Sequence, residues 1–361
     1  MTRHDVTVVM SASAGMGGLW ASDLREVTSD TSRLDSAGRW AVAIPYVGEP
    51  VCARFRDWSP TPSDDPLGRW QGPAQSSWST SLDEIGYMAA VESIRGSIAA
   101  GDVYQANICR VMSAPLPDAG EVDVAALSAL LAVANPSPYG GFLRLPDHGV
   151  HVATASPELF LSITPGRNGR RARSGPIKGT GRVASDLTEK DAAENIMIVD
   201  LVRNDLSIVS APGSVRVPQL LEVQEHPGLV HLVSYVEGIL GRDVRWPELL
   251  SATFPPGSVT GAPKLAALRL IAELEPASRT YYCGAFGWVD ADTGEAELAV
   301  AIRTFWVSEG LLHFGTGAGI TWGSDAAAEW RETQLKAEHL VDAASGSWPF
   351  EGAPAWQAGV P

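Results

Sequence analysis

The sequence predicts a single large domain of the α+β class. The chain has 361 residues, of which 45% are hydrophobic, so it can bury the sizeable core of one large or two ordinary domains. Strand-like and helix-like segments interleave along its length, and neither a composition break nor an internal repeat divides it. We expect residues 1–80 to form a strand-rich N-terminal part of the same domain and residues 81–344 to form its core. Residues 345–361 are expected to be a disordered tail.

The first part of the chain alternates between β and α patterns. Residues 39–48 and 51–58 have the apolar character of strands, and a loop rich in proline, serine and aspartate follows them. Over residues 81–100, apolar side chains recur at steps of three and four residues, which predicts a helix. The period then changes to that of a strand over residues 101–111.

A short helix, two strands and the central helix follow. Residues 123–135 predict an alanine- and leucine-rich helix, and a Pro-Asp-His-Gly turn joins the strand GGFLRLP to a strand at residues 150–163. The stretch from Arg173 to Leu206 opens with a Gly-Pro turn too rich in glycine for a helix interior. From about Leu187 onward it reads as a helix.

The last part of the chain repeats this mixture. One or two strands, including residues 230–240, precede a helix, a loop rich in proline and glycine, and a second helix within residues 246–274. Strands joined by turns are expected over residues 281–322, and a final helix over residues 325–344. This interleaving of many strands with helices favours one α+β domain over two.

Charge and cysteine content exclude several classes of protein. The formal net charge is −15, and nucleic acids and anionic membranes are bound through basic patches, so neither is an expected partner. No stretch approaches the roughly 18 apolar residues of a membrane-spanning helix, and no signal peptide is evident at the N-terminus. Cys52, Cys109 and Cys283 have no metal-binding spacing. We expect them to be core thiols of a cytoplasmic protein.

Two pairs of carboxylates are spaced three residues apart on predicted helices. Asp191 and Glu194 share one face of the central helix. Glu329 and Glu332 share one face of the last helix, with Lys336 one turn further on. If these helices face each other, the four carboxylates form an oxygen site suited to Mg²⁺. The alternative is a pair of solvated helix faces.

Two glycine-rich segments are candidates for anion binding. GTGAGI, residues 315–320, lies between a strand and the last helix, and is either a nest of backbone N–H groups or a plain tight turn. PGSVTGAPK, residues 256–264, leads into a helix whose N-terminus attracts negative charge.

Three side chains are candidates for the chemistry. Arg303 lies in an otherwise apolar strand and needs a carboxylate partner from a ligand or from the protein. Glu158 has an apolar setting that can raise its pKa for general-acid work, and an ion pair between the two is the alternative. Lys178 is an anion clamp, a desolvated nucleophile or an ordinary turn lysine. These residues indicate a Mg²⁺-assisted enzyme that acts on a small carboxylate.

Six motifs resemble those of the chorismate-utilising enzymes and occur in the same order. They are GDVYQANI, SPELF, PIKGT, AENIMIVDLVRNDL, SVTGAPK and AIRT…GAGI…SD…EWRETQLKA. The resemblance covers residues 81–344 and implies a chorismate-binding core there, while residues 1–80 match little. It also implies layered antiparallel sheets flanked by helices.

The resemblance implies a role for each matching residue. Glu194 and Glu332 would bind Mg²⁺ directly, and Asp191 and Glu329 through water, so that the ion holds the ring carboxylate of chorismate. Glu158 resembles the general acid that protonates the departing C4 hydroxyl. His231 resembles a catalytic histidine near the ring. The remaining matches would bind the substrate: Gln105, Ser258, Thr260, Gly261, Tyr282, Arg303, Gly317, Ala318, Gly319 and Lys336.

Two positions distinguish the branches of this family. Isochorismate and salicylate synthases carry a water-activating lysine where this chain has Gln105, so water addition is not expected. Anthranilate synthases have alanine at the position of Lys178, whereas aminodeoxychorismate synthases have lysine. The resemblance therefore implies that the Lys178 amine attacks C2 of the ring while the C4 hydroxyl leaves. Ammonia then attacks C4 and expels the lysine.

The implied product is 4-amino-4-deoxychorismate, a precursor of 4-aminobenzoate for folate or another product. Ammonia is expected from a separate glutamine amidotransferase, because no segment here resembles one. The alternatives are the large component of an anthranilate synthase, which also eliminates pyruvate, and a catalytically silent chorismate-binding subunit. Two departures from the family pattern concern fine positioning: PIKGTRPR continues here as PIKGTGRV, and RNDLG becomes RNDLS.

Overall fold

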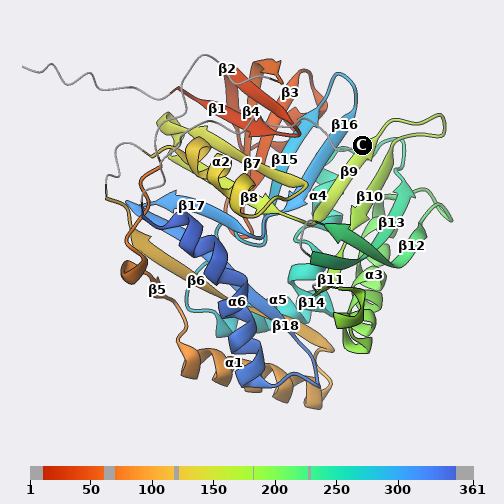
Figure 1. The fold of residues 1–361 in the computed structure, drawn as a ribbon. Helices are drawn as coiled ribbons and strands as arrows, with labels where there is room; N and C mark the ends of the chain where they lie inside the picture. Colours follow the sequence, from red (N-terminus) through yellow and green to blue (C-terminus); the bar gives the residue numbers. More distant parts are fainter. Residues whose placement is uncertain (1–10, 61–69, 118–121, 182, 227–228, 347–361) are drawn as a thin grey trace, which may run out of the picture.

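The computed structural model describes residues 11–60, 70–117, 122–181, 183–226 and 229–346, and it confirms the α+β class (Figure 1). The part of the expected disordered tail from residue 347 onward lies outside the described residues. Among the helices described, none combines the length and the apolar character needed to cross a membrane.

Antiparallel strands, arranged in two runs, form most of the domain. The first run has the order β12 (Arg216–His226), β13 (Leu229–Ile239), β10 (Arg171–Gly175), β9 (Leu159–Thr164), β16 (Glu295–Val300), β15 (Ala285–Asp290), β3 (Arg39–Ile44) and β4 (Val51–Ser59). β11 (Ile177–Gly181) also pairs with β13.

Two N-terminal strands, β2 (Leu19–Thr28) and β1 (Ser13–Met16), connect β4 to the second run. That run has the order β7 (Tyr139–Leu145), β8 (Val150–Ser156), β17 (Thr304–Ser308), β18 (Leu311–Ile320) and β6 (Gln105–Pro115). The short strands β5 (Ser79–Thr80) and β14 (Gly261–Ala262) both pair with β6.

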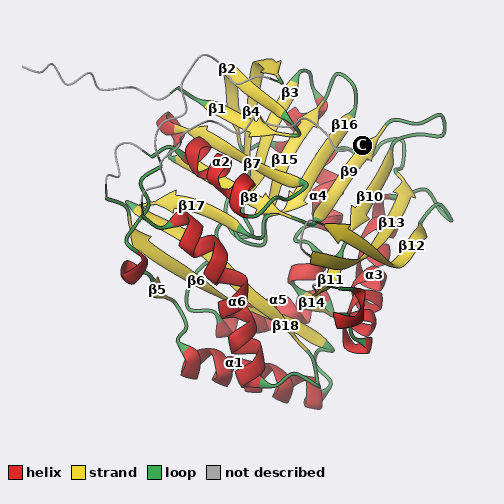
Figure 2. Cartoon of the chain, in the orientation of Figure 1, coloured by secondary structure: helices red, strands yellow, loops and turns green. Residues whose placement is uncertain are grey.

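Helices pack against the strands of both runs (Figure 2). α1 (Glu84–Ala100) and α6 (Ala326–Ala344) pack against each other and against β6 and β18, and α5 (Lys264–Leu274) packs on β6. α2 (Val124–Ala134) covers β7 and β8. α3 (Glu189–Val209) packs on β13 and β11, with α4 (Trp246–Thr253) beside it.

Local capping explains where the predicted helices begin and end. α1 begins after Asp83, whose carboxylate accepts a hydrogen bond from Gly86 N–H at 2.8 Å. It ends at Gly101, which has the left-handed conformation that glycine adopts easily. α3 begins with a capping box in which Thr188 and Asp191 exchange hydrogen bonds. These helices confirm the predictions made for residues 81–100 and 187–206.

The N-terminal strands continue the sheet of the core. β3 and β4 confirm the strands predicted at residues 39–48 and 51–58. β3 pairs along its whole length with β15, which lies more than 240 residues later in the chain. Trp40 of β3 and Phe286 of β15 are both buried in one apolar cluster, so the two parts of the chain share an interior. The three cysteines are buried free thiols, as the sequence predicted.

One predicted strand is divided in two. Residues 150–163 form β8 and β9, which are separated at Pro157 and Glu158. The Ser156 hydroxyl donates to Val300 O at 2.6 Å, and Val300 N–H donates to Glu158 O at 2.9 Å. These bonds to β16 hold the break in place, so the Glu158 side chain lies between two strands rather than within one.

Candidate active site

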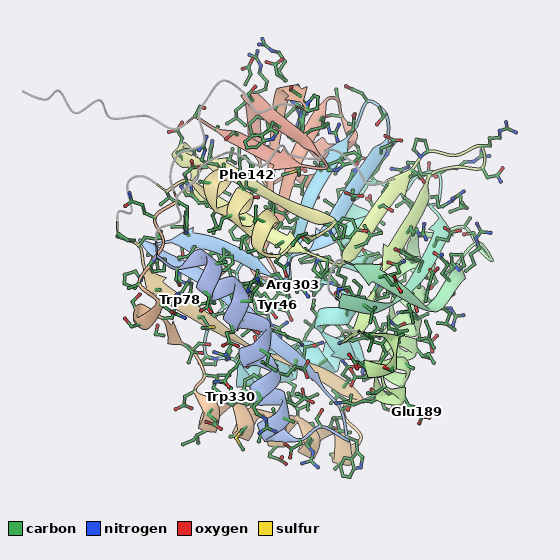
Figure 3. The ribbon with its side chains drawn as sticks, viewed as in Figure 1. Tyr46, Trp78, Phe142, Glu189, Arg303 and Trp330 are labelled. Carbon is green, nitrogen blue, oxygen red and sulfur yellow. The ribbon has the colours of Figure 1, made fainter. Side chains whose placement is uncertain are left out.

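A cavity of about 650 Å³ lies between the two runs of strands. β11, β13 and α3 contribute walls from the first run, and β18 and α6 from the second. Figure 3 shows Arg303 near the centre of the molecule, between these walls. The predicted site residues that line the cavity are Glu158, Lys178, Asp191, Glu194, His231, Ser258, Tyr282, Arg303, Gly317, Ala318, Gly319, Glu329, Glu332 and Lys336.

Glu158 is a buried carboxyl at this cavity, only 5% exposed. Its removal from water raises its pKa to about 7, although the Ser258 hydroxyl, the Lys178 ammonium and the Ile177 N–H all favour the ionised form. The predicted rise in pKa is therefore confirmed. Near neutral pH a large fraction of this carboxyl group retains its proton, as a general acid requires.

Lys178 extends from β11 toward Gly319 of β18. A Cβ placed on Gly319 would lie 3.3 Å from Lys178 Nζ and 2.4 Å from Gln105 Nε2. Glycine at position 319 therefore leaves room for both side chains. The Lys178 ammonium also lies close enough to Glu158 and Glu194 to favour their ionised forms. The amine thus lies between the candidate general acid and the candidate metal ligands.

The GTGAGI segment is part of β18, so the expectation of a nest or a tight turn was wrong. Its glycines are required by the close approach of neighbouring groups to the strand. A Cβ on Gly315 would lie 2.0 Å from the Tyr282 ring, and one on Gly317 would lie 2.5 Å from Ile108 O. Glycine is disfavoured in strands in general, but here it allows the contacts that shape the cavity wall.

Along the edge of this segment that faces the cavity, the backbone groups are not paired with any described strand. β17 pairs with β18 only as far as Phe314, whereas β6 continues along the other edge to Ile320. Lys336 Nζ donates to Gly317 O at 3.2 Å, so Gly317 directs its polar groups away from β6. The N–H and C=O of one residue in an antiparallel strand point to the same side, and the side alternates along the chain.

This alternation separates the three predicted backbone contacts. Gly317 and Gly319 direct their N–H groups to the cavity, and Ala318 directs its N–H to β6. The two residues of β6 opposite these glycines agree with this geometry, because their N–H groups do not donate to β18. Cys109 N–H donates to Glu275 Oε1 at 2.8 Å, and Asn107 N–H donates to Thr260 O at 2.7 Å. Two amides are therefore available for a ligand oxygen.

Arg303 is a partly buried cation with no counter-ion among the described residues. Burial lowers the pKa of its guanidinium, and no carboxylate of the described residues opposes this decrease. The ion pair with Glu158 that the sequence left open is not formed. Instead, Arg303 Nη1 donates to Asn135 Oδ1 at 3.2 Å. A desolvated cation that faces a cavity is stabilised by an anionic ligand, so Arg303 favours such a ligand here.

The two carboxylate pairs face each other across Lys190. Lys190 Nζ lies 3.3 Å from Glu329 Oε1 and 3.7 Å from Glu194 Oε1, and so links α6 to α3. Burial raises the pKa of Glu194, although Lys178 and Lys190 oppose the rise. In the described part of the chain, no group of three or more His, Cys, Asp or Glu side chains lies close enough to hold a metal ion.

The other two carboxylates also have partners. Glu332 Oε1 lies 2.6 Å from Lys336 Nζ, and Asp191 Oδ2 accepts from Thr188 N–H at 2.8 Å as part of the cap of α3. Carboxylate oxygens are the ligands that Mg²⁺ prefers, so the donor set fits this ion chemically. To gather around it, however, the carboxylates must give up contacts with lysine, above all with Lys190.

Three predicted substrate contacts do not line the cavity. The Thr260 hydroxyl donates to Pro256 O and Gly257 O, both at 3.2 Å, within its own loop. Gly261 pairs with β6 and therefore lies behind the wall. Gln105 is 1% exposed, and its Oε1 has no hydrogen-bond partner within the described residues. It supports the wall behind Gly319.

The sequence predictions missed several cavity residues, among them Asn135, Lys190 and His339. Lys190 had a visible signal, because it lies four residues before Glu194 on the same helix. Asn135 and His339 had none. His339 Nε2 bonds Ala134 O at 2.7 Å, so these residues are brought together by the packing of α6 against α2.

Comparison with known proteins identifies relatives. A sequence model of the family described as chorismate binding enzyme matches residues 48–342. The anthranilate synthase component 1 of Streptomyces coelicolor is 39% identical over 326 residues, 86% of this chain and 59% of that protein. The aminodeoxychorismate synthase component 1 of Salmonella typhimurium is 35% identical over 280 residues, 74% of this chain and 59% of that protein. The chain thus spans little more than half the length of these relatives.

Solved structures share the fold. The anthranilate synthase component I of Streptococcus pneumoniae superimposes with a TM-score of 0.73 at 23% identity, covering 94% of this chain and 95% of that one. The menaquinone-specific isochorismate synthase of Escherichia coli gives a TM-score of 0.74 at 18% identity, covering 92% and 88%. The expected layered antiparallel sheets flanked by helices are therefore confirmed.

Proposed function

The chain belongs to the chorismate-binding enzyme family, and we propose that it is the large component of an aminodeoxychorismate synthase. The observation that carries the proposal is Lys178, whose side chain lines the cavity near Glu158. A lysine at this place supplies a nucleophile, and a carboxyl with a pKa of about 7 supplies a proton to a leaving hydroxyl. An anthranilate synthase needs no such lysine.

Chorismate carries two carboxylates, and the cavity has groups suited to each. Arg303 and the N–H groups of Gly317 and Gly319 would bind one carboxylate through charge and hydrogen bonds. With the substrate held, the Lys178 amine forms a bond to C2, the two conjugated ring double bonds shift, and the C4 hydroxyl leaves as water with a proton from Glu158. Ammonia then forms the new bond at C4, the double bonds shift back and the bond from C2 to the lysine breaks. The new ammonium group at C4 returns a proton to the Glu158 carboxylate.

The residues that would hold Mg²⁺ are Asp191, Glu194, Glu329 and Glu332. When bound, the ion would supply the positive charge that binds the second carboxylate. Lys190, which lies between Glu194 and Glu329, would have to leave its two ion pairs first.

A partner and a pathway follow from the same reaction. Ammonia would come from a separate glutamine amidotransferase, and the names of the relatives, which call them component 1, favour a further subunit. The product would feed the synthesis of 4-aminobenzoate.

A second candidate is the large component of an anthranilate synthase. It is favoured by the 39% identity over 326 residues with the Streptomyces coelicolor anthranilate synthase component 1. Both reactions begin with chorismate in the same cavity, and they differ in whether the enolpyruvyl group is retained.

Product analysis distinguishes the candidates. Purified protein would be incubated with chorismate, Mg²⁺ and ammonium, and the products identified by mass spectrometry. An aminated product that retains the enolpyruvyl group supports the proposal. Anthranilate together with pyruvate establishes the second candidate instead. No turnover at any ammonium concentration would favour a catalytically silent chorismate-binding subunit.

A further inference from the structure

Asn135 lies outside every motif described above, yet its side chain contacts the arginine proposed to bind substrate. It follows the last residue of α2, and its backbone N–H donates to Leu131 O at 2.7 Å, which fixes its main chain to the helix. Its Oδ1 accepts from Arg303 Nη1 at 3.2 Å, and Asn135 itself lines the cavity.

Arg303 is held in an unusual backbone conformation at this contact. Its φ of 52° is in the left-handed region, which costs a residue with a side chain about 1 kcal/mol or more. The Arg303 carbonyl accepts from Ala155 N–H at 2.9 Å, so the main chain is fixed from β8. Strain of this kind persists where the surrounding structure imposes it, and here it directs a guanidinium toward Asn135 at the cavity.

The chemical identity of the partner is the informative feature. A desolvated arginine is ordinarily paired with a carboxylate, which orients it and cancels its charge. Here a carboxamide orients the guanidinium without cancelling the charge. The amide has a cost, because Asn135 Nδ2 is buried and has no hydrogen-bond partner within the described residues. An aspartate of the same size would have no such unpaired donor and would bind Arg303 more strongly.

We propose that Asn135 is a positioning residue for Arg303: it fixes the direction of the guanidinium while leaving its positive charge to the substrate carboxylate. The inference rests on the proposed function, because it takes chorismate as the ligand. It holds equally for the aminodeoxychorismate and anthranilate reactions, since both start from the same dianion.

The test compares Asn135→Asp and Asn135→Ala with the wild type. Chorismate affinity is measured by calorimetric titration with Mg²⁺ present, and stability by thermal unfolding without ligand. Asn135→Asp should weaken chorismate binding about tenfold or more, because the new carboxylate competes for Arg303, while its melting temperature stays equal or rises. Asn135→Ala leaves the positive charge of Arg303 uncancelled and removes only the hydrogen bond that orients its guanidinium. It should therefore weaken chorismate binding less than Asn135→Asp does, and it should lower the melting temperature.

The matched control is Asn168→Asp, which adds the same charge in an exposed turn between β9 and β10. It should leave chorismate affinity unchanged. In the steady state, Asn135→Asp should raise KM for chorismate more than it lowers kcat, as expected for lost binding.

The proposal is supported if Asn135→Asp binds chorismate less tightly than Asn135→Ala and yet has the higher melting temperature. A purely structural role would instead lower affinity and stability together in each variant. The inference alone is overturned if the wild type binds chorismate and Asn135→Asp binds it equally well. It is also overturned if Asn135→Asp loses affinity and stability in parallel with Asn135→Ala. If the wild type binds no chorismate, the proposed function fails, and the inference fails with it.

Discussion

Replacing Glu158 by glutamine should make the protein inactive and, at alkaline pH, more stable. Burial raises the pKa of Glu158 from 4.5 to about 7, a difference of roughly 2.5 units, or about 3 kcal/mol. Between these two values the folded protein holds a proton that the unfolded chain releases. The free energy of unfolding therefore falls as pH rises through this window, and it levels off above the folded-state pKa.

Glutamine has the same shape and does not ionise. Glu158→Gln should therefore match the wild type near pH 4.5 and exceed its free energy of unfolding by up to about 3 kcal/mol near pH 8. The Glu158 carboxyl would no longer donate a proton, so turnover of chorismate should be lost at both pH values.

Urea unfolding, followed by tryptophan fluorescence at the two pH values, measures the stability difference, and turnover is measured on the same preparations. Glu49→Gln, in the exposed turn after β3, is the matched control and should show no pH-dependent gain. The reasoning is refuted if Glu158→Gln is no more stable than the wild type near pH 8, because the buried carboxylate would then carry no penalty.

Three further predictions concern neighbouring parts of the structure. Gly319→Ala should lower both kcat and the free energy of unfolding, because its Cβ would lie 3.3 Å from Lys178 Nζ and 2.4 Å from the buried Gln105 Nε2. Unchanged steady-state kinetics would contradict this. Lys190→Met should increase Mg²⁺ affinity severalfold in calorimetric titrations without substrate. The change removes the ammonium group that links Glu194 to Glu329. Equal or weaker Mg²⁺ binding would contradict this. Lys264→Met should lower the free energy of unfolding, measured with urea, by about 3 kcal/mol. The reason is that Asp205, whose carboxylate lies 2.6 Å from Lys264 Nζ, loses its cationic partner. A loss below about 1 kcal/mol would contradict this.

The sequence predicted best those elements whose signals are local. α1, α3 and α6 follow from apolar periodicity, whereas their capping residues, Asp83 in α1 and Thr188 in α3, were identified only in the structure. The acidic pairs could be placed on helix faces for the same reason. That α3 and α6 meet at one cavity could not be derived from spacing, because it depends on pairing between strands far apart in the chain.

The least predictable features depend on tertiary contacts. Glycines normally argue against a strand, yet Gly315 and Gly317 lie within β18 because Tyr282 and β6 approach it closely. Nothing near Asn135 in the sequence indicates that it meets Arg303, 168 residues later. Lys190 could be expected to pair with its own helix, but not with Glu329 on another.

The most direct test of whether Lys178 is a nucleophile compares the rates of product formation by the wild type and by Lys178→Ala. Wild type and Lys178→Ala would be incubated with chorismate, Mg²⁺ and ammonium, and the aminated product that retains the enolpyruvyl group would be quantified by mass spectrometry. If Lys178 attacks C2, the variant should form this product at least about 100-fold more slowly, because a covalent step is lost. A variant that forms its product at close to the wild-type rate would contradict the proposed role of Lys178.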